Sequence, residues 1–284
     1  LFDKGDSEMK ILIDGKEQNI NTTDFFFTPK VVKKDAVTMS LPVAKGSIDI
    51  SYSLIPGSYL LNMDIQAKGI EGFFSSKTNT FELVWNEKMK QQEKGWDFEN
   101  RYSTITYRDV KKDTEELSSM GGDEEEDEFE ENIKWIAYKT QFFSQVLIAD
   151  KSVKVSSMSS KKIDKGEGYL KTLNTTMTSE FDPSGKKATS FSLYLGPNKF
   201  STLGENEDIL NSDFNLDLRS LVYLGWPIVR WINRFFILYL FDWLTGWGLN
   251  MGIVLLILTI IIKVLVFPLM KKSFISSANM RVLR

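Results

Sequence analysis

The sequence predicts a mostly β domain followed by two helical segments, an amphipathic one at a membrane interface and an apolar one across the membrane. Three observations support this prediction: short alternating apolar runs in the first two-thirds, a Trp- and Phe-rich stretch after residue 221, and an apolar run from Met251 to Met270. The chain of 284 residues has room for one large domain or two small ones. We divide it into a β domain at 1–204, a connector with an interfacial helix at 205–247, a transmembrane helix at 248–270 and a cationic segment at 271–284.

Strand-like runs separated by turn residues fill the first part of the β domain. Examples are 10–15, 47–54 and 59–66, with turns at Asp14-Gly15, Lys45-Gly46 and Pro56-Gly57. Further strands are expected at 103–108, 133–148, 151–156, 169–179 and 189–195. Because no helical period separates these runs, they predict an antiparallel sandwich. The polar stretches 87–100 and 205–215 are expected to be loops or short helices.

Composition excludes several classes of function. The chain has no cysteine and therefore no disulfide, so a hydrophobic core must stabilise the domain. It has no histidine, which removes the commonest zinc ligand and every histidine-based catalytic triad. The net charge of −3, without a basic stripe in the polar part, argues against direct nucleic-acid binding. No cofactor or metal is expected.

An acidic insert at 113–131 contains the run Asp123-Glu-Glu-Glu-Asp-Glu128. One interpretation is a calcium site, but the spacing lacks the alternating ligands and central glycine of an EF-hand loop. The other is a solvated, mobile surface loop, which is what we expect.

The apolar run Met251–Met270 is about 20 residues long and would reach ~30 Å as a helix, enough to cross a bilayer. Lys263 lies inside it, where a lysine costs on the order of 1–3 kcal/mol or more to insert. Lys271 and Lys272 follow at once, and no acid occurs after them. This positive flank predicts a cytoplasmic C-terminal end and a β domain on the opposite side of the membrane.

The stretch before this run predicts a helix that lies in the membrane interface. Trp226-Pro227 is a suitable start, since proline is tolerated in the first turn. Two arginines and four tryptophans suit headgroup depth but not the hydrocarbon core; they are Arg230, Arg234, Trp226, Trp231, Trp243 and Trp247. The alternative is a buried helix in a soluble core.

Five segments in a fixed order resemble the YidC membrane-insertase family, in particular the Gram-negative type with a large periplasmic domain. They are 135–143, 193–199, Leu224-Gly-Trp-Pro227, Thr259-Ile-Ile-Ile-Lys263 and Phe267-Pro268-Leu269. The resemblance implies a periplasmic β-supersandwich of the galactose-mutarotase-like kind, an interfacial helix and the first helix of a five-helix core. Residues 271–284 would begin a cytoplasmic helical hairpin. The sequence would then be a fragment, without the N-terminal signal-anchor helix and the later core helices.

The same resemblance implies a substrate groove with Lys263 at the position of a family arginine. Thr259 lies four residues earlier and so shares a helix face with it. Lysine keeps the charge but loses the planar fork that binds carboxylates bidentately. The alternatives are that Lys263 snorkels to the interface and that the Thr259 hydroxyl bonds back to its own helix. Proline at 268 is expected to end the helix rather than act as a hinge.

The implied function is insertion and folding of inner-membrane proteins, alone or with the Sec translocon. The implied partners are nascent membrane proteins and the lipid bilayer, with SecYEG, SecDF and the ribosome as further candidates. Two rival functions remain open: a membrane-anchored periplasmic scaffold, and a carbohydrate- or peptide-binding module with a cleft lined by Trp and Tyr. Aldose epimerase chemistry is excluded, because that family uses histidine.

Overall fold

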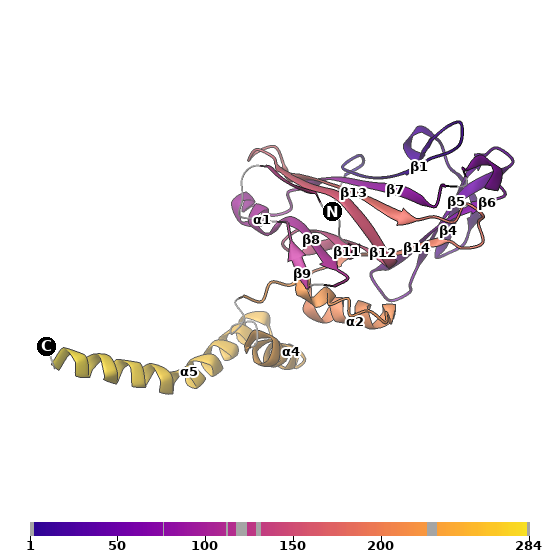
Figure 1. Ribbon diagram of the computed structural model, residues 1–284. Helices are drawn as coiled ribbons and strands as arrows, with labels where there is room; N and C mark the ends of the chain where they lie inside the picture. The colour runs from indigo at the N-terminus through magenta and orange to yellow at the C-terminus, as the bar shows by residue number, and fades with distance from the viewer. Residues whose placement is uncertain are drawn as a thin grey trace. The chain divides into compact units, whose positions relative to one another are not determined.

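The computed structural model describes residues 3–75, 77–111, 113–117, 124–128, 132–225 and 232–282 (Figure 1). Contacts divide the chain into two units, Leu1–Val222 and Tyr223–Arg284. The first, which we call the β unit, contains all the described strands. The second, which we call the helical unit, contains the candidate membrane segments. The mostly β class with helices at the C-terminal end is therefore confirmed.

The described strands of the β unit form one 14-stranded antiparallel sheet. The main path runs β2-β1-β7-β13-β12-β14-β6-β5-β4-β3, while β8, β9, β10 and β11 join beside it through β12. The strands are β1 Ser7–Ile13, β2 Ile20–Asn21, β3 Thr28–Val32, β4 Ala36–Val43, β5 Gly46–Leu54, β6 Leu60–Lys68, β7 Thr80–Lys90, β8 Thr104–Asp109, β9 Thr114–Glu116, β10 Glu124–Glu128, β11 Asn132–Lys139, β12 Phe143–Lys162, β13 Tyr169–Glu180 and β14 Thr189–Pro197.

The described helices of the β unit are short, whereas the helical unit contains the long helix α5. The β unit has α1 at Trp96–Tyr102, α2 at Phe200–Leu210 and the 3-10 turns η1 Thr22–Asp24, η2 Glu71–Phe73 and η3 Leu218–Leu221. The helical unit has a π-helical turn η4 at Asn233–Ile237, then α4 at Leu238–Thr245 and α5 at Met251–Val282.

The long strand β12 organises the sheet because its two halves have different partners. Its first part, from Phe143 to Ala149, pairs with β14, and its second part, from Lys154 to Lys162, pairs with β13. Between them the pairing with β11 is irregular, and Lys134 of β11 donates to the main-chain carbonyls of Asp150 and Lys151. The lysine therefore satisfies carbonyl groups that the interrupted ladder leaves without strand partners.

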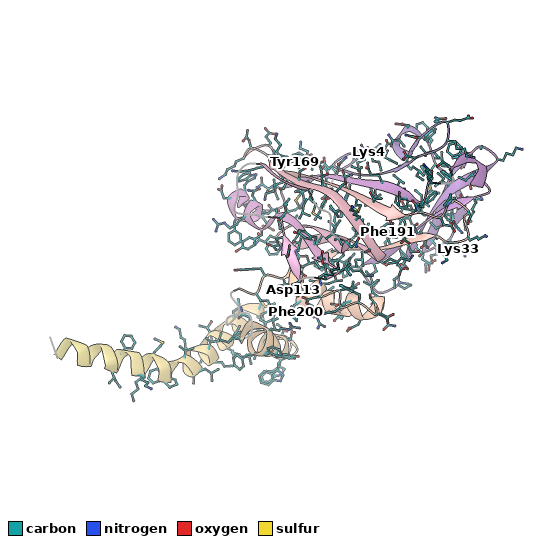
Figure 2. All side chains as sticks on the ribbon, viewed as in Figure 1. Lys4, Lys33, Asp113, Tyr169, Phe191 and Phe200 are labelled. Atoms are coloured by element: carbon teal, nitrogen blue, oxygen red, sulfur yellow. The ribbon has the colours of Figure 1, made fainter. Side chains whose placement is uncertain are left out.

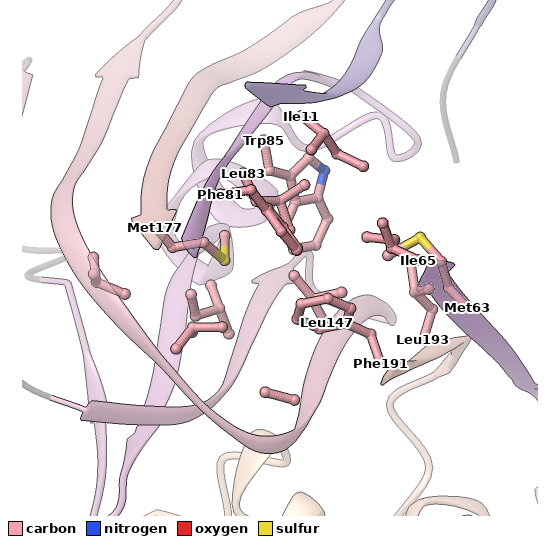
Figure 3. Close-up of a cluster of buried hydrophobic side chains, with 14 of the residues drawn as sticks. Ile11, Met63, Ile65, Phe81, Leu83, Trp85, Leu147, Met177, Phe191 and Leu193 are labelled. Carbon is pink, nitrogen blue, oxygen red and sulfur yellow. The ribbon is translucent and has the colours of Figure 1, made fainter. Parts of the chain in front are cut away.

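The main core lies on the inner face of the curled sheet. Strand β7 shows the period of two that puts it there: every second residue, including Phe81, Leu83, Trp85 and Met89, is buried, while the alternate residues are partly exposed. Figure 3 shows labelled side chains from β6, β7, β12, β13 and β14 pointing into one space. The ring of Trp85 stacks on Tyr138 with centroids 3.9 Å apart. Full burial of such side chains stabilises by roughly 1.5–3 kcal/mol each.

A second core cluster fixes the segment after the sheet. The Trp135 indole donates a 2.7 Å hydrogen bond to the Leu216 carbonyl and lies among Leu203, Leu218 and Leu221. This packing explains why α2 and η3 belong to the β unit, although the sequence suggested a connector from residue 205. The helix expected within 205–215 exists, but it begins earlier, at Phe200.

Two further expectations differ from the structure. The described parts of the acidic insert contain the strands β9 and β10, where a loop was expected. Pairing explains β10, since it lies against Ser157–Lys161 of β12 with Glu124 opposite Lys161. The polar stretch 87–100 is also partly strand, because β7 continues to Lys90.

Candidate functional site

The candidate membrane span begins at a capped turn. The Asn250 side chain accepts a 2.9 Å hydrogen bond from the Gly252 amide, so it satisfies one of the free N–H groups at the start of α5. The window Met251–Pro268 has a mean hydropathy of 2.7 and is only 6% buried. By length and composition this helix could cross a bilayer.

The helix does not end at Pro268, so the expected termination there is wrong. α5 continues through the proline to Val282 and includes the basic residues Lys271 and Lys272, both exposed. A proline inside a helix removes one main-chain hydrogen bond, and apolar segments tolerate this loss where local adjustments compensate for it.

One side of α5 packs on α4. Leu244 of α4 is buried against Val254 and Leu258 of α5, and Ile262 extends this contact along the helix. Many apolar side chains elsewhere on α5 are at least half exposed, among them Met251, Ile253, Leu255, Leu256, Ile260, Val264, Leu265 and Phe267. An exposed apolar surface of this extent indicates that a membrane or another protein covers the helix.

The two residues predicted to form a groove wall lie on exposed parts of α5. The Thr259 hydroxyl donates a 2.7 Å hydrogen bond to the Leu255 carbonyl, which is the back-bonded alternative considered above. Lys263 follows one turn later, is exposed, and has neither a hydrogen-bond nor an ion-pair partner among the described residues. The two side chains therefore lie on one strip of the helix, one hydroxyl with its proton engaged and one cation free.

The residues predicted to lie at the interface are only partly described. Trp226, Arg230 and Trp231 lie outside the described residues. Arg234 is exposed in the π-helical turn, with its guanidinium 5.8 Å from the Phe235 ring. Trp243 and Trp247 are 54% and 58% exposed and meet edge to face with centroids 4.4 Å apart. Exposed tryptophans next to an apolar helix are typical of the headgroup region.

Sequence reasoning missed a buried carboxyl group in the β unit. Glu87 is 3% exposed on the core side of β7, where it accepts hydrogen bonds from Gln145 at 2.6 Å and Ser7 at 3.4 Å. Burial outweighs these bonds and raises the pKa of Glu87 to about 7. The signal was present in the sequence, since Glu87 shares the alternation of Leu83, Trp85 and Met89.

A second buried carboxylate, Asp49, has a lowered pKa, in contrast to Glu87. It is 2% exposed, accepts from Ser40 at 2.6 Å and Ser47 at 2.8 Å, and lies 3.0 Å from the Lys68 ammonium. Burial by itself would raise its pKa, but the hydrogen bonds from Ser40, Lys68 and Ser47 outweigh burial and lower the pKa to about 2. Asp49 therefore ties β4, β5 and β6 together as a charged group.

A polar cavity of about 530 Å³ lies between the sheet and the segment after α2. Its wall includes two cross-strand pairs, Ser190 to Asp64 at 2.6 Å and Ser192 to Asn62 at 3.0 Å. The aromatic rings that line it are Phe191 and Phe214. No Trp or Tyr ring among the described residues lines this cavity, so it does not provide the lining that would support the carbohydrate- or peptide-binding alternative.

The β unit and the apolar helix α5 together define a β-domain protein with a candidate membrane anchor. Residues 11–239 match the family described as the YidC periplasmic domain. The chain belongs to this family, as its sequence motifs predicted.

Curated relatives support the assignment. The chain is 46% identical over 285 residues to the membrane protein insertase YidC of Phocaeicola vulgatus, and 40% identical over 285 residues to that of Bacteroides fragilis. It is 34% identical over 291 residues to that of Porphyromonas gingivalis. Each match covers 100% of this chain and 46% of the relative, so the chain spans about half the length of these proteins.

A solved structure from Escherichia coli K12 with a provisional aldose 1-epimerase name also matches the chain. It covers 60% of this chain and 68% of its own, at a TM-score of 0.34 and 7% identity. At this score the similarity supports no argument by itself, and the mostly β class rests on the sheet described above.

Proposed function

We propose that this chain is part of a membrane protein insertase and chaperone, which inserts and helps fold proteins of the bacterial inner membrane. Membership of the YidC periplasmic domain family and the names of the curated relatives support this proposal. The observation that distinguishes it from a simple anchor is Lys263, an exposed cation within an otherwise apolar helix window and without a partner among the described residues.

In this proposal α5 forms one wall of a hydrophilic groove within the membrane, and Lys263 and Thr259 face that groove. A hydrophilic tail of a substrate costs several kcal/mol to bring into hydrocarbon. A wet groove lowers that cost, and the cation attracts acidic residues of the tail. The apolar helix of the substrate then moves sideways into lipid, where burial stabilises it. No covalent bond is made or broken.

The proposed placement follows from charge and composition. The β unit lies in the periplasm, Arg230, Arg234 and the tryptophans lie at the outer interface, and Lys271 and Lys272 lie on the cytoplasmic side. Nascent membrane proteins and the bilayer are the direct partners. SecYEG, SecDF and the ribosome are further candidates, and the family resemblance is what suggests them.

The rival function is a membrane-anchored scaffold, in which Lys263 only snorkels to the interface. Crosslinking separates the two, because a photoreactive residue at position 263 of the full-length protein contacts a nascent membrane protein only if a groove exists. The matched control is Leu265, which is 53% exposed and about 200° around the helix from Lys263. Crosslinks to the nascent chain from position 263 but not from 265 support insertion; crosslinks only to lipid from both positions support the anchor.

A further inference from the structure

The outer edge of strand β3 combines exposed apolar side chains with lysines. We name this surface the β3 rim; it consists of Phe26, Val31, Val32, Leu54, Lys33 and Lys34. Phe26 is 96% exposed, Val32 is 72% exposed and Leu54 is 58% exposed. Figure 2 shows Lys33 at one extremity of the β unit. Single exposed apolar residues are ordinary, but a row of them along one edge indicates a binding surface.

The local sequence explains why these side chains point outward. Phe27 packs against the main core, so its neighbour Phe26 is turned to the opposite side. Strand β3 is the last strand of the sheet path and is exposed at each of its positions. The Leu54 amide donates a 2.8 Å hydrogen bond to the Asp35 carbonyl, which holds Leu54 beside the turn that contains Lys33 and Lys34.

The edge is poorly suited to pairing with another strand. Pro29 lacks an N–H group, and the register with β4 shifts between Pro29 and Val31. Proline, lysine and irregular register are the features that discourage strand addition at a sheet edge. A second copy of the chain would also bring Lys33 and Lys34 against the same lysines. These observations disfavour an extended peptide and a self-associated dimer.

A lipid surface with anionic headgroups matches both the apolar side chains and the positive charge of the β3 rim. Apolar side chains next to lysines are the composition that binds such surfaces, with the rings and branched chains among the acyl chains and the ammonium groups among phosphates. Two acids flank the rim, Asp24 before β3 and Asp35 after Lys34, and none lies between them. The proposed membrane anchor α5 keeps a bilayer within tethered reach of the β unit.

We propose that the β3 rim is a second membrane contact, through which the β unit binds the surface of an anionic bilayer. This contact rests on the proposed anchoring by α5 but is distinct from the groove. It would hold the periplasmic unit against the bilayer by Phe26, Val31, Val32 and Leu54, with Lys33 and Lys34 supplying the preference for anionic lipid.

The absence of cysteine allows a direct test by single-cysteine nitroxide labelling. The full chain is reconstituted in vesicles of phosphatidylethanolamine and phosphatidylglycerol and labelled after Phe26→Cys or, as a control, Phe98→Cys, which is 51% exposed on α1. A third variant, Val264→Cys on α5, reports on the anchor. Oxygen concentrates in lipid, whereas a water-soluble nickel complex stays in water. We therefore expect the nitroxide to collide more often with oxygen than with nickel at positions 26 and 264, but not at 98.

Charge reversal tests the role of the lysines. Lys33→Glu with Lys34→Glu should lower the membrane-bound fraction at position 26 by roughly tenfold or more, as expected for two cations near an anionic surface. Lys94→Glu with Lys154→Glu, exposed lysines before α1 and on β12, should leave it unchanged.

Three outcomes would overturn the proposal. They are a label at position 26 that is as water-accessible as the label at 98, dipolar broadening from a second copy, and immobilisation without contact with oxygen-rich lipid, which would indicate a protein partner. If position 264 also fails to contact lipid, the anchoring itself is wrong; if 264 contacts lipid and 26 does not, only the rim is wrong.

Discussion

The side-chain amide of Gln145 donates a 2.6 Å hydrogen bond to Glu87, and both residues are buried inside the β unit. This pair places a carboxyl group among Leu83, Trp85 and Met89, and no cation among the described residues is bonded to it. Burial raises the pKa of Glu87 from 4.5 to about 7, so the group changes charge near neutral pH.

The pH dependence of stability follows from this shift. The unfolded chain loses the Glu87 proton near pH 4.5, whereas the folded chain holds it to about pH 7. Folding stability should therefore fall by roughly 3 kcal/mol between these values and change little above them. Glu87→Gln should remove this slope in urea unfolding. Glu82→Gln, on the other face of β7, is the control, and an unchanged slope in Glu87→Gln would show that another group is responsible.

Asp49 should act in the opposite direction at acid pH. Its pKa is lowered from 3.8 to about 2, so its contribution is present above pH 3.8 and is lost as pH falls towards 2. The loss should be about 2 kcal/mol. Asp49→Asn should be destabilised at pH 7 and should lack this acid step. If acid unfolding of the variant parallels that of the natural chain below pH 4, the assignment to Asp49 is wrong.

The charge at position 263 should control which substrates are inserted. Lys263→Arg keeps the cation, while Lys263→Glu reverses it. We expect Lys263→Glu to impair insertion of substrates with acidic translocated tails several-fold more than Lys263→Arg, because the tail would meet a like charge. Insertion is measured by protease protection of the tail at equal protein levels. Equal insertion by both variants would exclude the electrostatic role.

The Trp135 indole should hold the segment after α2 against the sheet. Trp135→Phe removes the donor to the Leu216 carbonyl and leaves a buried acceptor, at a cost of about 1–3 kcal/mol in addition to lost packing. Cleavage by protease within 210–222 should become faster. Trp243→Phe, at a site that is 54% exposed, should leave both stability and cleavage unchanged. Slow cleavage of both variants would argue against this role of Trp135.

Sequence patterns predicted those elements that depend on local period. The alternation at 47–54 and 59–66 corresponds to β5 and β6, and the apolar run from Met251 corresponds to the first two-thirds of α5. Pairing between distant segments was not predictable, since the acidic strand β10 exists through its register with β12. The helix through Pro268 was missed for another reason, because a proline rule derived in water does not transfer to an apolar segment.

The sequence identified Lys263 as a candidate site residue, but it did not identify the partners of the buried side chains. Lys263 stands out in the sequence because a cation interrupts an apolar run. Gln145, which bonds Glu87, and Lys68, which bonds Asp49, come from other strands, so no local pattern could name them. The alternation of β7 could nevertheless have marked Glu87 as inward-facing.

The bond from Thr259 to Leu255 has a consequence for the chemistry of the α5 strip. A threonine hydroxyl has one proton and two lone pairs, and the proton is already given to the helix. In the proposed groove, Thr259 could therefore only accept from a polypeptide, while the Lys263 ammonium could only donate. The strip therefore offers one hydrogen-bond acceptor and one donor, about 6 Å apart along the helix axis, which could bind the N–H and the C=O of a peptide group. Such a surface would solvate main chain as well as acidic side chains.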